Sequence, residues 1–201
     1  AKRTGKSTLM RIIAGTARSV RLAQPAGRDI RPTLDRVREA LFSILGPGIV
    51  DCRFLDLYSG TGANGLEALS RGAAHADLVE ADKTARALIV ENIAKTKLGE
   101  SARLHALTLP EGLRRLPHDA PYQFIYADPP HVYTDYAALL VAVEANALLA
   151  PGGVIILEHA TRTPVADEMG AFTRTRAAAY GGTTLSFFRA KVEMPVEHEA
   201  A

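Results

Sequence analysis

The sequence has little cysteine and no long apolar run, and both shortages restrict what the protein can be. Cys52 is the only cysteine among 201 residues, so no disulfide can form within the chain. Its apolar surroundings favour a packed core thiol in a reducing compartment. The richest apolar stretch, residues 136–149, is interrupted by Glu144 and Asn146, and a membrane-spanning helix needs about 20 apolar residues. We therefore expect a cytoplasmic protein with no membrane partner and no metal site.

Basic residues are concentrated near the start of the chain. Residues 1–38 contain ten of the 24 lysines and arginines but only two acids, whereas the remainder is net acidic. A basic segment on a mildly acidic body is typical of a protein that binds a polyanion, and a solvated tail is the alternative. The arginines expected to give this electrostatic footprint are Arg11, Arg18, Arg21, Arg31, Arg36 and Arg38.

Hydrophobic patterns after residue 48 alternate between strands and helices. We expect strands at 54–57, 76–80, 102–108, 124–127 and 154–157, and helices at 63–71, 83–96 and about 133–149. Segments 172–179 and 184–189 flank Gly181-Gly182 and are typical of a β-hairpin. This order predicts an α/β fold with a doubly wound, Rossmann-like sheet that is mostly parallel and ends in an antiparallel hairpin.

Residues 1–48 are expected to form a basic extension for binding nucleic acid, made of a small hairpin and a helix. Segments 10–14 and 19–22 are short strand candidates. A helix beginning at Pro32 has one apolar face, with Arg36 and Arg38 off that face, and Gly46-Pro47-Gly48 ends it. The expected division is therefore 1–48 for the extension, 49–192 for the core and 193–201 for a loose acidic tail.

A glycine-rich loop follows the first core strand. Gly60, Gly62 and Gly65 are spaced as in a dinucleotide-binding loop between a strand and a helix. Gly60 would permit a tight turn, Gly62 a close approach of a ligand, and Gly65 close packing of the helix on the strand. An ordinary strand-to-helix turn is the alternative to a cofactor site.

Two carboxylates favour S-adenosylmethionine over NAD as the ligand of this loop. Asp56, at the end of the first strand, suits a sulfonium and an ammonium better than a pyrophosphate. Glu80, at the end of the second strand, can accept both ribose hydroxyls. The residues expected to bind the cofactor are Asp56, Tyr58, Ser59, Gly60, Thr61, Gly62, Glu80, Ala81 and Thr108.

The strongest catalytic signal is Asp128-Pro129-Pro130, at the end of the fourth strand. The prolines fix the backbone direction and remove two N–H donors, which leaves an array of hydrogen-bond acceptors. Such an array can hold the hydrogens of an exocyclic amino group and aim its lone pair at an electrophilic methyl group. A proline-rich turn is the alternative. Asp128, Pro129, Pro130 and the following His131 are the predicted catalytic residues.

With these motifs the sequence resembles the bacterial 16S ribosomal RNA guanine-N2 methyltransferases of the RsmD type. The resemblance includes residues 10–15, 31–42, 54–63, 65–73 and 128–130. It implies S-adenosylmethionine as the methyl donor and guanine N2 of 16S rRNA as the acceptor, in a largely assembled small subunit. It also implies that the basic extension, including the helix at residues 31–42 that contains Thr33, faces RNA. We expect the enzyme to be a monomer.

Two positions depart from the family pattern. His131 stands where the family usually has Tyr or Phe to stack on the acceptor base, and Tyr133 is the alternative stacking residue. Thr108 stands where Asp or Asn usually meets the adenine. Three other interpretations remain open: an NAD-dependent oxidoreductase, an RNA-binding assembly factor without catalysis, and a methyltransferase acting on DNA adenine or protein glutamine.

Overall fold

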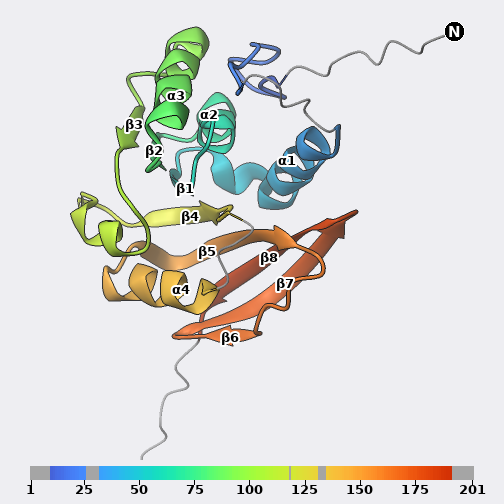
Figure 1. The fold of residues 1–201 in the computed structure, drawn as a ribbon, viewed down its shortest axis with the longest axis vertical. Coiled ribbons are helices and arrows are strands. Elements are labelled where there is room, and N and C mark those ends of the chain that lie inside the picture. The colour runs from blue at the N-terminus through green and yellow to red at the C-terminus, as the bar shows by residue number, and fades with distance from the viewer. Residues whose placement is uncertain (1–9, 26–31, 118, 131–134, 192–201) are drawn as a thin grey trace, which may run out of the picture.

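A computed structural model of the protein describes residues 10–25, 32–117, 119–130 and 135–191. Its centre is an eight-stranded sheet in the order β3-β2-β1-β4-β5-β8-β7-β6 (Figure 1). The strands are β1 (Arg53–Leu57), β2 (His75–Val79), β3 (Ala102–His105), β4 (Tyr122–Ala127), β5 (Leu149–Ala160), β6 (Glu168–Met169), β7 (Phe172–Tyr180) and β8 (Thr183–Ala190). The helices are α1 (Pro32–Leu45), α2 (Ala63–Ser70), α3 (Lys83–Thr96) and α4 (Tyr136–Ala145), with 3₁₀ turns η1 (Gly46–Ile49) and η2 (Glu111–Arg115).

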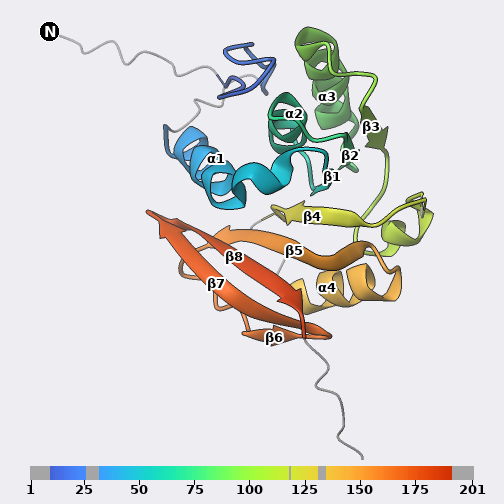
Figure 2. The same ribbon diagram turned by 180° about the vertical axis from the view of Figure 1, so that it is seen from behind.

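The predicted α/β sheet with a C-terminal hairpin is confirmed. Strands β1 to β5 pair in parallel, and β8 joins the sheet antiparallel to β5 and to β7. Figures 1 and 2 show α1, α2 and α3 on one side of the sheet and α4 on the other. Parallel strands covered on both faces must be apolar on both faces, which explains their nearly continuous hydrophobic runs.

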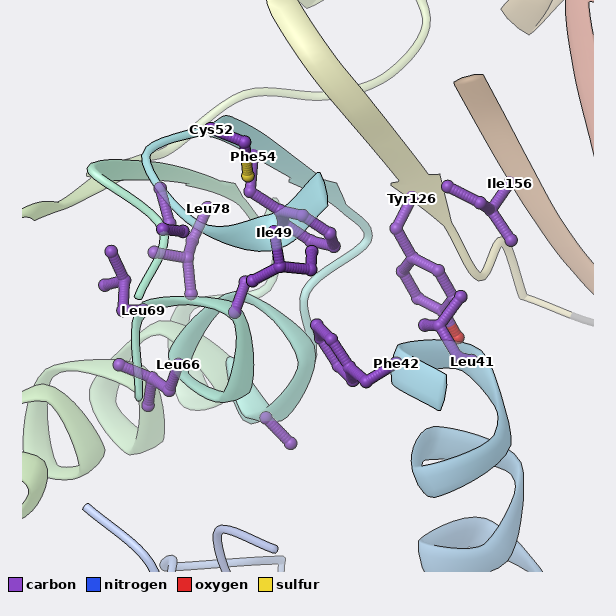
Figure 3. Packing of buried hydrophobic residues seen from close by; sticks show 14 of the residues in the cluster. Leu41, Phe42, Ile49, Cys52, Phe54, Leu66, Leu69, Leu78, Tyr126 and Ile156 are labelled. Carbon is purple, nitrogen blue, oxygen red and sulfur yellow. The ribbon is translucent and has the colours of Figure 1, made fainter. Parts of the chain in front are cut away.

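Two hydrophobic clusters fill the spaces on the two sides of the sheet. Phe54, Leu78 and Tyr126 point towards α1, α2 and α3, whereas their neighbours along the strands point towards α4 and η2. Figure 3 shows the first cluster, where the Phe42 ring of α1 stacks on Phe54 at a centroid distance of 6.0 Å. Cys52 lies in this cluster, and burial raises the pKa of its thiol to about 11. The predicted role as a packed core thiol is confirmed.

The hairpin predicted at residues 10–22 is present as an antiparallel pairing, but it does not form two regular strands. One isolated bridge joins Arg11 to Arg21, and Ile12 N donates to Val20 O at 3.0 Å and Leu22 N to Met10 O at 2.9 Å. The reason lies in α2, whose side chains take backbone N–H groups that a strand ladder would need. Glu67 accepts from Ile13 N at 2.7 Å and from Ala14 N at 3.0 Å, and Ser70 Oγ accepts from Ala17 N at 2.9 Å.

Several predicted boundaries also differ from the observed ones. The expected helix at 133–149 is α4, Tyr136–Ala145, which begins where the Asp135 carboxylate accepts from Ala138 N at 3.0 Å. Strand β3 ends at His105 because its partner β2 ends at Val79, the residue paired with it. Strand β5 extends to Ala160 because β8 pairs with it beyond the end of β4. Over the ranges that the structure describes, no helix has the length and hydrophobicity of a membrane span.

Candidate cofactor and methyl-acceptor site

The predicted site residues meet at the carboxyl ends of β1, β2 and β4. Strand order reverses between β1 and β4, because β2 and β3 lie on one side of β1 whereas β4 and β5 lie on the other. In an open α/β sheet this switch point leaves a crevice for a ligand. The glycine loop follows β1, Glu80 follows β2 and Asp128 follows β4, so the structure brings all three predicted motifs to one edge of the sheet.

The glycine loop between β1 and α2 is a tight structure that side chains would disrupt. Gly62 has a φ of 78°, and a Cβ there would lie 2.9 Å from Leu78 Cδ2. A Cβ on Gly65 would lie 3.1 Å from Leu78 Cγ. Both positions therefore require glycine for close packing of α2 on β2, which was the reason expected for Gly65 but not for Gly62. Ser59 Oγ donates to Asp56 O at 2.6 Å and thereby fixes the first turn.

Asp56 lies beneath this loop and is 1% exposed. Its Oδ2 accepts from Gly65 N at 2.9 Å, whereas its buried Oδ1 has no hydrogen-bond partner in the protein. Burial, opposed by the Gly65 bond and assisted by the charge of Glu80, raises the pKa of Asp56 to about 7. An orphaned carboxylate oxygen fits a cationic ligand such as the ammonium of S-adenosylmethionine. Since Oδ1 is closed off from solvent, direct contact with a ligand requires the loop to move.

Glu80 joins the glycine loop to the start of α3. Its Oε2 accepts from Gly60 N at 2.9 Å, and its Oε1 accepts from Asp82 N at 2.8 Å. Each carboxylate oxygen can accept a second hydrogen bond, so the partly exposed group can still receive ribose hydroxyls. Ala81 follows β2 and Thr108 follows β3, and both residues are exposed. The Glu80 carboxylate therefore fits the ribose end of the predicted cofactor.

Asp128 follows β4 and remains accessible to solvent, whereas Pro129 is buried. Its backbone N donates to Leu57 O at 3.4 Å, which ties the end of β4 to β1. The surrounding protein atoms, then the carboxylates of Glu158 and Asp56, raise the pKa of Asp128 well above its usual value. Predicted residues His131 and Tyr133 lie outside the described residues.

Sequence reasoning missed Tyr126 and Glu158 beside Asp128. Tyr126, on β4, is 2% exposed, and its hydroxyl donates to the Glu158 carboxylate on β5. Neither residue stands in a recognisable motif. Their positions could have indicated them, because Tyr126 and Glu158 each lie within two residues of the end of a predicted strand, and these two strands, β4 and β5, are neighbours in the sheet.

The basic residues divide into an exposed group and one buried member. Arg11, Arg18, Arg21 and Arg36 are exposed, and Arg31 and the side chain of Thr33 lie outside the description. Arg38 is 5% exposed, pairs with Asp35 at 2.8 Å and lies 3.8 Å from the fully buried Glu67. The prediction that Arg38 faces RNA is therefore wrong, because a buried carboxylate needs a cation beside it.

The segment that contains the exposed arginines is fastened to the cofactor loop. Asn92, fully buried on α3, accepts from Ala23 N at 2.6 Å and donates from Nδ2 to Ala23 O at 3.1 Å and to Thr61 O at 2.9 Å. Ile12 and Leu22 belong to the same core cluster as the sheet. Charge substitutions therefore probe this segment better than its deletion, which would remove core residues.

The fold and the site together define a class of protein. The S-adenosylmethionine-dependent methyltransferases share this combination: a Rossmann-like sheet that ends in an antiparallel hairpin, and carboxylates that flank the glycine loop. The chain belongs to the family described as "Conserved hypothetical protein 95", whose model matches residues 10–189.

Similarity to individual proteins supports membership of this family. The chain is 36% identical over 149 residues to "Ribosomal RNA small subunit methyltransferase D" of Escherichia coli (strain K12), covering 74% of each chain. It is 30% identical to "Putative rRNA methyltransferase YlbH" of Bacillus subtilis (strain 168), over 90% of this chain and 98% of that one. The solved structure "Putative methyltransferase yhhF from Escherichia coli" superposes with a TM-score of 0.79 at 30% identity, over 92% of this chain and 100% of that chain. The resemblance stated from the sequence is confirmed.

Proposed function

We propose that this protein transfers the methyl group of S-adenosylmethionine to the exocyclic N2 amino group of a guanine in 16S ribosomal RNA. Methylation of ribosomal RNA with this donor follows from the family and the relatives. The guanine N2 atom is the finer part of the proposal. The observation that supports it is the acceptor-rich Asp128-Pro129-Pro130 turn, which follows β4 next to the glycine loop.

The glycine loop and its two flanking carboxylates would hold the cofactor. When bound, S-adenosylmethionine supplies an electrophilic methyl group on a sulfonium. Asp56 would neutralise the methionine ammonium, and Glu80 would accept the ribose hydroxyls. The backbone of residues 58–62 would line the remaining path, with Ala81 and Thr108 towards the adenine. An unpartnered Asp56 oxygen and a partly exposed Glu80 carboxylate support this assignment.

Asp128 would orient the acceptor. Its carboxylate accepts hydrogen bonds from the amino group, which discourages conjugation of the nitrogen lone pair with the ring and aims it at the methyl group. The negative charge also stabilises the positive charge that develops on nitrogen. Pro129 and Pro130 keep competing N–H donors away. His131 would stack on the base once it has left the RNA structure, and Tyr133 is the competing candidate.

The exposed arginines would bind the phosphate backbone of the RNA. Arg11, Arg18 and Arg21 lie on the segment that Asn92 fastens to Thr61, and Arg36 lies exposed on α1. We expect Arg31 and Thr33 to extend the same surface. The proposed partner is an assembled or nearly assembled small ribosomal subunit, bound by a monomeric, cytoplasmic enzyme without a membrane partner.

Transfer of a tritiated methyl group tests the proposal. Small subunits from cells that lack the protein are incubated with labelled S-adenosylmethionine and the protein, and the RNA is digested to nucleosides. Label in N2-methylguanosine is the expected result, and Asp128→Ala should abolish it. Label in another nucleoside would refute the N2 assignment. Retained binding of subunits without any transfer would instead support an assembly factor, and binding of NAD in titration would support an oxidoreductase.

A further inference from the structure

Three carboxylates gather on one face of the sheet, and one of them has no role in the proposed mechanism. Asp56 is paired in register with Tyr126, and Ala127 with Leu157, so Glu158 occupies the next position on β5 and Asp128 the position directly after β4. Alternate residues of a strand share a face. Since Tyr126 and Ile156 point into the same core cluster, Glu158 lies on that face too, beside Asp128.

Tyr126 holds Glu158 in place. The tyrosine ring is buried between the sheet and α1, where Figure 3 shows it beside Leu41 and Ile156. Its hydroxyl donates to Glu158 Oε2. A ring packed on all sides cannot follow a moving partner, so the bond restricts where the Glu158 carboxylate lies relative to the neighbouring strand.

The Glu158 carboxylate adds negative charge beside Asp128. A neutral amide could accept the Tyr126 hydrogen bond without repelling Asp56 and Asp128, whereas the protein atoms around Asp128 and then the Glu158 carboxylate raise the pKa of Asp128. Among the residues that the structure describes, Tyr126 and, on α4, Tyr136 also feel these carboxylates, and burial followed by nearby carboxylate charge raises the pKa of each. The described side chains Leu41 and Phe42 of α1 in this cluster are apolar.

We propose that Glu158 and Asp128 form one proton-accepting pair, in which Glu158 is a positioning residue that acts through Asp128. The inference rests on the proposed function. As the nitrogen–carbon bond forms and the carbon–sulfur bond breaks, the sulfonium becomes a neutral thioether and the amino nitrogen becomes cationic. That nitrogen then passes one proton to Asp128, from which it reaches solvent. Glu158 makes Asp128 a stronger base than a lone carboxylate would be.

Glu158→Gln tests this role because it removes the charge and keeps an oxygen that can accept from Tyr126. Glu168→Gln is the matched control, since Glu168 is an exposed residue of β6 that pairs with Lys191 at 3.0 Å. The first measurement is the titration of the Asp128 carboxyl carbon by NMR in the protein without ligands, assigned from its loss in Asp128→Asn. We expect the Asp128 titration midpoint to fall in Glu158→Gln and to stay unchanged in Glu168→Gln.

The second measurement is the single-turnover rate at saturating S-adenosylmethionine and RNA. Glu158→Gln should lower this rate by about tenfold or more, with the cofactor Kd unchanged. Glu158→Asp, which restores the charge, should recover part of both the rate and the titration midpoint. An unmoved Asp128 midpoint, an unchanged rate, or an aspartate variant as impaired as the glutamine variant would each overturn the proposal. Absence of guanine methylation by the unsubstituted protein would refute the proposed function instead, since the NMR measurement needs no substrate.

Discussion

Replacement of Glu80 by alanine should weaken cofactor binding more than any change on the exposed side of α3. The Glu80 carboxylate accepts from Gly60 N at 2.9 Å and from Asp82 N at 2.8 Å, so it connects the glycine loop to the first turn of α3. In the proposed site it also accepts the ribose hydroxyls. The alanine variant therefore loses a direct ligand contact and an anchor of the loop at once.

The size of the effect follows from these bonds. A hydrogen bond to a charged group contributes about 1.5–3 kcal/mol, so the lost ribose contact alone should raise the Kd roughly 10- to 150-fold. Gly60 N is in a partly exposed loop and can turn to water, so its lost partner adds a smaller cost. Glu80→Gln keeps one acceptor oxygen and should fall between the alanine variant and the unsubstituted protein.

Isothermal titration with S-adenosylmethionine and with S-adenosylhomocysteine provides the assay. Both molecules carry the ribose, so Glu80→Ala should weaken both by a similar factor, which separates the ribose contact from effects on the sulfonium. Glu91→Ala is the control, because Glu91 pairs with Lys95 at 2.7 Å on the exposed side of the same helix. Equal Kd values for Glu80→Ala and the unsubstituted protein would refute the assignment of Glu80 to the ribose.

Four further outcomes are expected. Burial raises the folded-state pKa of Asp56 to about 7, above its value in the unfolded chain, so this group makes the free energy of unfolding fall as pH rises from about 4 to 7. Denaturant titrations of Asp56→Asn should therefore show a flatter dependence of that free energy on pH. An unchanged dependence would contradict a buried carboxyl at this position. Asp128→Asn should lose most turnover while keeping its melting temperature, and an unchanged rate would show that the charge is not needed. Arg36→Gln should weaken RNA binding and reduce its salt dependence, whereas Arg38→Gln should lower the melting temperature because it removes one of the two cations, Arg38 and Arg71, that lie beside buried Glu67. The reverse pattern in filter binding and calorimetry would exchange the roles of Arg36 and Arg38. His131→Ala should raise the KM for RNA and lower turnover while His131→Phe stays active, and normal kinetics of the alanine variant would remove His131 from the stacking role.

The parts of the site that local sequence could determine are those in which backbone geometry and chemistry coincide. Glycines at 60, 62 and 65 after an apolar strand predicted the loop, and carboxylates at strand ends predicted Asp56, Glu80 and Asp128. The Gly181-Gly182 pair predicted the hairpin for the same reason, since its turn needs little more than its own residues. In each case the information lies within a few positions of the feature.

Tertiary structure alone decided the residues whose role depends on a distant neighbour. The sequence predicts Arg38 to be a surface arginine of an amphipathic helix, yet it is buried beside Glu67, which belongs to another helix. Glu158 lies within a strand and acquires its environment only because β5 lies next to β4, where Tyr126 and Asp128 meet it. The charge pattern along a segment cannot reveal such pairs. Which charges are buried together depends on how helices and strands that are far apart in the chain pack against each other.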